Sequence, residues 1–102
     1  MKDNDVRISV LLTMQVALLG AVGPDVREVL CRWSASEISI RAVFDGPVRE
    51  DDAEAMLEVE TEMMASFPGH DISLVCERCD APQAILMRDG EQAVFARLEA
   101  SA

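Results

Sequence analysis

Two eight-residue segments with alternating side chains, joined by only three residues, constrain the fold of this chain more than any other feature. They are residues 26–33 (VREVLCRW) and 37–44 (EISIRAVF). Successive side chains of a strand point to opposite faces, so this alternation predicts two strands. Parallel strands need a much longer connection, so the two strands should form an antiparallel hairpin. Its apolar face, which other elements must cover, consists of Val29, Cys31, Trp33, Ile38, Ile40, Ala42 and Phe44.

Two further segments have apolar residues at helical spacing and can supply this cover. Residues 5–19 are apolar on more than one face, with Gly20 just past the end, which predicts a buried helix. Residues 48–67 form an amphipathic pattern that stops before Pro68, because a residue that precedes proline is disfavoured in the helical region. We expect Trp33 to be largely buried between the sheet and a helix.

The C-terminal third of the chain predicts more sheet. Residues 70–79 read as a third strand, and residues 84–88 and 91–98, joined by Asp89-Gly90, predict a last hairpin. The order of elements predicts a single α+β domain over residues 1–102. We expect an antiparallel sheet of four to five strands with two helices packed on one face.

Composition excludes several classes of partner. The chain has 102 residues and a net charge of −10, so a nucleic acid or an anionic membrane would repel it, whereas a basic protein would attract it. The apolar run at residues 8–19 is too short to cross a bilayer and is interrupted by Ser9, Thr13 and Gln15. Three cysteines, an odd number, and no secretory signal predict a cytoplasmic protein.

The negative charge is concentrated on the second predicted helix and its approach. From Asp45 to Glu62 there are eight acids against a single arginine, Arg49. The helix dipole favours acids in the first turn, but Glu58 and Glu62 approach its negative end and repel each other at i,i+4 spacing. We therefore predict a surface for a basic protein, formed by Glu50, Asp51, Glu54, Glu58 and Glu62.

Other acids have different expected roles. Glu60 falls on the apolar side of the helix, where we expect it to pair with an arginine from the sheet. If the helix proves to be only a solubilising surface, the binding site should instead involve Asp71, Glu77, Asp80 and Asp89.

Cysteine and histidine residues raise the alternative of a metal site. Cys76 and Cys79 form a CxxC motif, and His70 and Cys31 could complete four zinc ligands. Structural zinc sites use two such pairs, however, and side chains three apart on a strand point to opposite faces. We expect these cysteines to be packing residues, with no metal and no cofactor. The sequence also lacks the nucleophile, phosphate-loop, metalloprotease and calcium-loop motifs, so we expect no enzyme activity.

Several stretches together resemble a known family. They are LLTMQVALLG at residues 11–20, the strand ending in Trp33, FDG at 44–46, TEMMASFP at 61–68 and RCDAP at 78–82. The chain is similar there to small acidic bacterial immunity proteins of contact-dependent growth inhibition and related polymorphic toxin systems. The resemblance implies a cytoplasmic protein that binds and blocks the C-terminal domain of its cognate toxin, often a nuclease with a basic groove. Members of that family tend to have Ser or Thr where this chain has Arg49, so the resemblance does not define where the second helix begins.

Two functional readings remain open at the level of sequence. The first is a toxin-neutralising immunity protein. The alternative is a non-enzymatic regulatory or adaptor domain that docks a basic protein or self-associates through its sheet, and a homodimer is compatible with both. A gene for a secreted effector with a C-terminal toxin domain, next to the gene for this protein, would favour the first reading.

Overall fold

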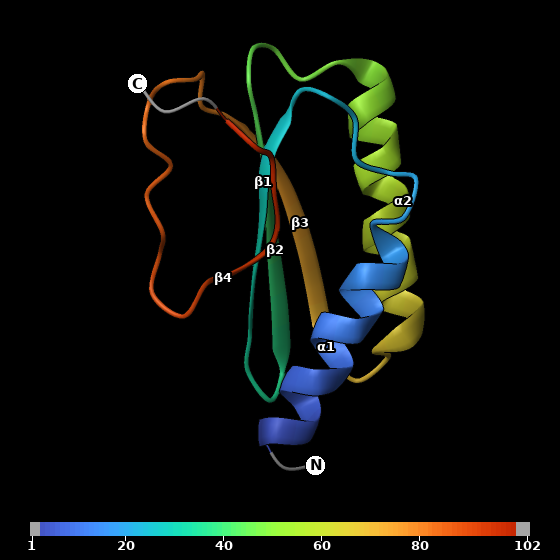
Figure 1. The fold of residues 1–102 in the computed structure, drawn as a ribbon. Helices are drawn as coiled ribbons and strands as arrows, with labels where there is room; N and C mark the ends of the chain where they lie inside the picture. Colours follow the sequence, from blue (N-terminus) through green and yellow to red (C-terminus); the bar gives the residue numbers. More distant parts are fainter. Residues whose placement is uncertain (1–2, 100–102) are drawn as a thin grey trace.

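The fold is a four-stranded sheet with two helices on one face, seen in a computed structural model that describes residues 3–99 (Figure 1). The strands lie in the order β3-β2-β1-β4. The predicted α+β class and the placement of both helices on one face are confirmed. The elements are α1 (Asp3–Ala17), β1 (Val26–Trp33), β2 (Glu37–Phe44), α2 (Glu50–Ser66), β3 (Asp71–Arg78) and β4 (Gln92–Ala96).

The predicted hairpin is confirmed at the predicted bounds. β1 and β2 pair antiparallel, with Trp33 opposite Ile38 and Val29 opposite Ala42. The Ser34 hydroxyl oxygen accepts hydrogen bonds from the backbone N–H groups of Ser36 and Glu37, which stabilises the tight connection. At its other end β1 has an irregularity between Val26 and Glu28, and such bulges redirect a side chain.

The prediction of a purely antiparallel sheet is wrong, because β2 and β3 are parallel. A helix of 17 residues spans about 25 Å, which is close to the length of an eight-residue strand, about 26 Å. α2 therefore returns the chain to the end of the sheet where β2 began, and β3 must run in the same direction as β2 (Figure 1). The helix is the crossover connection that parallel neighbours require.

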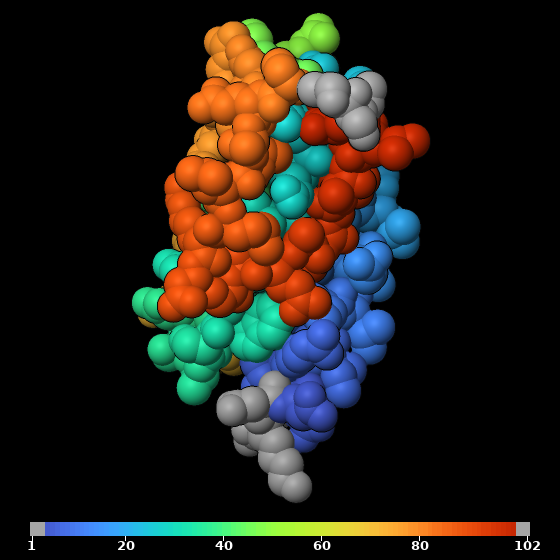
Figure 2. All heavy atoms as spheres, turned by 60° about the vertical axis from the view of Figure 1, so that its left-hand side comes forward, coloured from blue at the N-terminus to red at the C-terminus, as the bar shows by residue number. Residues whose placement is uncertain are grey.

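The predicted C-terminal hairpin is also wrong. Residues 84–88 form no strand, and β4 pairs with β1 instead, with Phe95 opposite Val29. Asp89-Gly90 does form a turn, in which Gly90 has a φ of +79° that suits glycine. The segment of residues 79–91, which we call the covering segment, lies across the sheet face opposite the helices (Figure 2).

The main core lies between the sheet and the two helices. Phe44 and Met14 are its largest fully buried side chains, and Cys31 is buried beside them. Trp33 is less buried than predicted: it packs against the core with only part of its surface. The reason is its place as the last residue of β1, at the hairpin end, where a surface hollow with Arg32 and Glu37 borders it.

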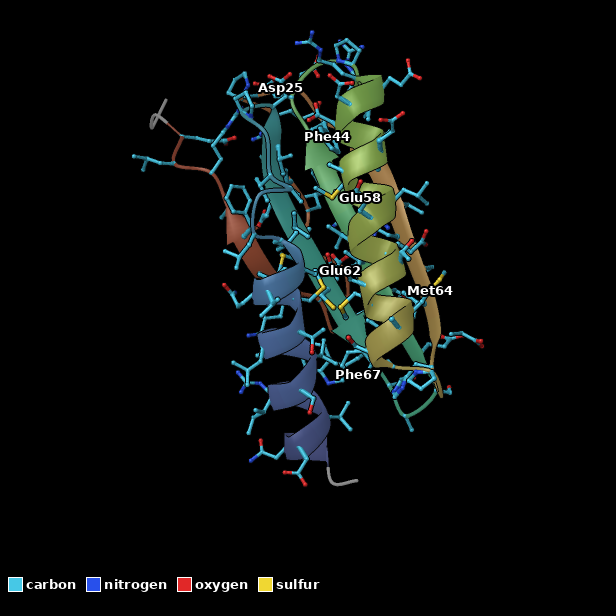
Figure 3. The ribbon with its side chains drawn as sticks, turned by 90° about the vertical axis from the view of Figure 1, so that its right-hand side faces the viewer. Asp25, Phe44, Glu58, Glu62, Met64 and Phe67 are labelled. Carbon is cyan, nitrogen blue, oxygen red and sulfur yellow. The ribbon has the colours of Figure 1, made fainter. Side chains whose placement is uncertain are left out.

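The first helix is not the buried helix that its composition predicted. Val10, Met14 and Ala17 face the core, but the opposite side of the helix faces solvent. No element of the described chain covers α1 from outside, because both helices form a single layer on the sheet (Figure 3). An apolar side of α1 therefore stays exposed.

Candidate functional site

The surface of α2 gathers all five acids that the sequence analysis assigned to partner binding. Met56, Val59 and Met63 are the buried residues of α2 and fix its rotation on the sheet. With these three residues inward, the helical period turns the acidic positions outward. The exposed acids of this surface, which we call the acidic surface, are Glu50, Asp51, Glu54, Glu58 and Glu62.

The remaining two acids of α2 point inward and have structural roles. The carboxylate of Glu60 accepts a hydrogen bond from the backbone N–H of Leu74 at 2.9 Å. The expected pairing of Glu60 with an arginine is therefore wrong. The free edge of β3 carries unpaired N–H groups, and this carboxylate satisfies one of them. Asp52 packs against Gly23, where an added Cβ would lie 2.8 Å from the Asp52 carboxylate.

The acidic surface has no counter-charge within the described residues. None of the ion pairs found among residues 3–99 involves a residue of α2. Arg49, at the N-cap of this helix, makes no capping bond with its side chain. Only the first-turn acids gain from the helix dipole, so the later ones, Glu58 and Glu62, repel each other without local compensation.

Five arginines outside the helices are, by contrast, paired within the protein, whereas Arg32 forms no ion pair among residues 3–99. These ion pairs consume five arginines and five carboxylates, so they add nothing to the net charge. The arginines are Arg27, Arg41, Arg78, Arg88 and Arg97, and the carboxylates are those of Asp45, Glu77, Asp80, Glu91 and Glu99. The unbalanced charge of the molecule therefore lies elsewhere, and α2 carries the largest share of it.

Arg27 shows how this face is held together. It follows Val26 at the irregularity of β1 and is 5% exposed. Its guanidinium donates to both carboxylate oxygens of Glu99 at 2.8 and 2.9 Å, and to the carbonyl oxygens of Cys79 at 2.7 Å and Gln83 at 2.8 Å. The bonds to Arg27, joined by that from Arg97, hold the pKa of Glu99 down to about 2. Arg27 thus fixes the start of the covering segment to β1.

Arg41 fixes the other end of the covering segment. It is 6% exposed and donates to both carboxylate oxygens of Glu91, at 2.6 and 2.9 Å, and to the Leu86 carbonyl oxygen at 3.0 Å. The bond to Arg41 holds the pKa of Glu91 below its ordinary value. Arg41 also reaches Glu77, at 3.3 Å. The alternation of β2 correctly puts Arg41 on the face away from the core, but that face is covered rather than open.

The second set of predicted binding acids is not gathered into one site. Glu77 pairs with Arg41 and Arg88. Asp80 accepts hydrogen bonds from the Arg78 side chain at 2.9 Å and from the backbone N–H of Gly46 at 2.7 Å. Asp71 and Asp89 are exposed, the former at the start of β3 and the latter in the turn before β4. Two of these four carboxylates therefore serve the fold.

Sequence reasoning missed a second exposed feature of the helix layer, on α1. Ile8, Leu12 and Val16 follow one another at i,i+4 spacing, and Leu19 continues the line just past the helix. These four side chains are 48%, 63%, 65% and 79% exposed, and we call them the aliphatic stripe. The signal was present: a helix that is apolar all round is either buried on all sides or covered by something else.

The cysteines and the histidine do not converge. Cys76 packs against the core on the helix side, whereas the Cys79 sulfur lies 3.7 Å from Arg27 Nη1 on the other face. Within residues 3–99, no three side chains of the metal-binding types cluster closely enough to hold an ion. Burial raises the pKa of the Cys31 thiol to about 12, which removes it as a nucleophile at neutral pH. His70 packs edge-on against Phe67, with ring centroids 5.7 Å apart.

The geometry described above indicates the general class of protein to which this chain belongs. A small α+β domain whose buried arginines pair internally, and whose charged and aliphatic side chains remain open on one layer, has the properties of a protein-binding domain. In the described part of the chain, neither helix is long and apolar enough to span a lipid bilayer.

The comparison with protein families identifies the chain. The sequence profile of the MafI2 immunity protein family matches residues 7–99, and this protein therefore belongs to that family. The match confirms the resemblance to immunity proteins of polymorphic toxin systems, a class that is generally non-enzymatic. No individual curated protein is similar enough to the chain to count as a match.

Proposed function

We propose that this protein neutralises a cognate bacterial toxin by binding the toxin domain through the acidic surface of α2. One observation carries the proposal. The carboxylates of α2 have no ion-pair partner within residues 3–99, although five carboxylates elsewhere in the same small molecule are paired with arginine. Charge that costs the isolated helix stability and serves no contact within the protein is explained by a partner.

The charge of the acidic surface indicates the kind of toxin domain it fits. A row of exposed carboxylates attracts a basic protein surface and accelerates association by steering. A nuclease is the toxin class that fits best, because the groove that binds a phosphate backbone is itself basic. The protein would then act in the cytoplasm, occupy the position of the nucleic acid, and bind neither nucleic acid nor a membrane itself.

A protection assay tests this function. The toxin domain encoded beside the gene for this protein is expressed from an inducible promoter in cells that contain either the parent protein or the variant Glu54→Gln/Glu58→Gln/Glu62→Gln. We expect the parent to restore growth and the variant to protect poorly while accumulating to the same level.

A matched control separates local charge from total charge. The variant Glu37→Gln/Asp71→Asn/Asp89→Asn also removes three carboxylates that are exposed and outside every ion pair of the described residues. It should protect as well as the parent. Equal protection by both variants would place the toxin-binding site elsewhere, and no protection by the parent would reject the immunity role against this toxin.

A further inference from the structure

The aliphatic stripe on α1 has no function in the fold. A helix of a two-layer domain needs one apolar side, and Val10, Met14 and Ala17 provide it. Leu12 and Val16 lie on the opposite side and expose 63% and 65% of their surface. Contiguous exposed apolar side chains of this kind are uncommon on a soluble monomer and mark interaction sites.

The stripe and the acidic surface belong to the same layer of the molecule. α1 and α2 lie side by side on one face of the sheet, and Figure 3 shows Glu62 on the flank of α2 that faces α1. Met64 lies on the opposite flank of α2 in the same view. A partner that contacts the acidic surface from outside is therefore adjacent to the stripe as well.

Charge decides which partner can cover the stripe. A second copy of this chain would bring a second net charge of −10, with its acids concentrated on the same layer, toward the first, and this repulsion opposes self-association. An anionic lipid surface is repelled for the same reason. A basic protein surface with an apolar ridge matches both features at once, because its cations can face α2 while its ridge covers α1.

We propose that the aliphatic stripe, Ile8, Leu12, Val16 and Leu19, is the apolar half of the toxin interface and that the acidic surface is its charged rim. This inference rests on the proposed function and assigns the two halves different tasks. Fully buried aliphatic side chains at the centre of an interface limit dissociation, whereas rim charges govern association and its dependence on salt.

The test uses the full chain and the toxin domain encoded beside its gene, in an inactive form, as the probe. Leu12→Gln/Val16→Gln is compared with Leu86→Gln/Met87→Gln, which removes two exposed apolar side chains, 78% and 54%, from the covering segment on the other side of the sheet. Losing two buried aliphatic side chains should weaken binding about 100-fold. Most of the change should appear as faster dissociation and should persist at high salt. The control pair should bind within about threefold of the parent, since side chains outside the interface carry little binding energy.

A second variant distinguishes a loss of toxin binding from a folding defect. Leu12→Ala/Val16→Ala places the strongest helix former at both positions and should show the same direction of effect with a thermal transition no lower than that of the parent. If the parent binds the toxin domain and both stripe variants bind equally well, the inference fails and the proposed function stands. If the parent does not bind, both fall. A parent that sediments as a dimer, together with a monomeric Leu12→Gln/Val16→Gln variant, would show that a second copy covers the stripe and would also overturn the inference.

Discussion

The two faces of the sheet are stabilised by different physics. The helix face is apolar: Phe44, Ile38 and Ile40 form one buried hydrophobic cluster with side chains of α1 and α2. The opposite face contains Leu30 and Val43, but its fixed points are the guanidinium groups of Arg27 and Arg41, each nearly fully buried and hydrogen-bonded through all three nitrogens. In Figure 2 the covering segment, in orange, crosses this second face.

The charged residues on the two sides of the sheet differ in role: some stabilise the fold, and others remain available to a partner. On the covered face, the two buried guanidinium groups, those of Arg27 and Arg41, are each balanced by carboxylates within the protein. On the helix side, the core needs no charge at all, and the acids of α2 stand outside it without counter-ions. We infer that the covered face maintains the fold and that the outer surface of the helix layer performs the function. The following predictions test this division in order of decreasing effect.

The largest effect should come from the helix face. Phe44 is the largest fully buried side chain of the core, and Phe44→Ala should destabilise the fold by about 3–5 kcal/mol through lost burial and a cavity. That is a large fraction of the total stability of a small domain. Urea titration followed by circular dichroism measures it. A loss below about 1 kcal/mol would mean that the core is not centred at this strand.

The covered face should respond to a broken ion pair almost as strongly. Arg41→Met leaves the Glu91 carboxylate, 6% exposed in its side chain, without its main partner, which should cost about 3 kcal/mol. Arg41→Met/Glu91→Leu removes both charges and should recover at least half of that loss, since a well-packed apolar pair can replace a buried ion pair. A double variant as unstable as the single one would contradict the assignment of the stability to this pair.

Acid should weaken the covered face selectively. Glu99 has a pKa of about 2 in the folded protein against an ordinary value of 4.5, so its contribution to stability is complete above about pH 4.5 and is lost as the pH falls toward 2. The lowered pKa values of Glu91, Asp45 and Asp80 act in the same direction. Glu28, whose pKa burial raises, acts in the opposite direction. Amide exchange should show the covering segment losing protection before β2, and Glu99→Gln should reduce the slope of stability against pH.

The smallest effect on stability should come from the acidic surface. Glu54→Gln/Glu58→Gln/Glu62→Gln removes three repulsive i,i+4 pairs, the first of them with Glu50, and should stabilise the helix by about 0.2 to 0.5 kcal/mol for each. The same urea titration measures the gain. A clear loss of stability would reveal a structural role for these acids and would remove the contrast between the two faces.

The sequence predicted those parts of the fold that local patterns determine. The hairpin of β1 and β2 has the predicted bounds, because period-two alternation and a three-residue connection leave few alternatives. The direction of β3 depends on where α2 ends in space, and a crossover rule applied to the helix between β2 and β3 would have predicted it. Asp89-Gly90 correctly signals a turn, but the segment before it contacts Arg41 instead of forming a strand: Arg41 donates to the Leu86 carbonyl oxygen, 45 positions away in the sequence. No local signal reveals that contact.

The candidate site, like the fold, was predicted from the sequence only in part. The acidic surface follows from helical period and was predicted residue by residue, although binding at these positions stays a prediction. The aliphatic stripe was visible as excess apolar character in residues 5–19, yet sequence alone does not tell whether a second layer covers such a helix. The roles of Glu77 and Asp80 as internal partners depend on arginines that the fold brings near them from other parts of the chain.

The most direct test of the central claim is the association rate with the toxin domain as a function of ionic strength. The parent is compared with Glu54→Gln/Glu58→Gln/Glu62→Gln and with the matched control Glu37→Gln/Asp71→Asn/Asp89→Asn in stopped-flow mixing. If the acidic surface of α2 steers the toxin, the first variant should associate at least about tenfold more slowly at low salt and should show a flatter salt dependence, while the control follows the parent. Equal slowing by both variants would mean that only total charge matters, and unchanged association of the first variant would contradict the assignment of function to the helix layer.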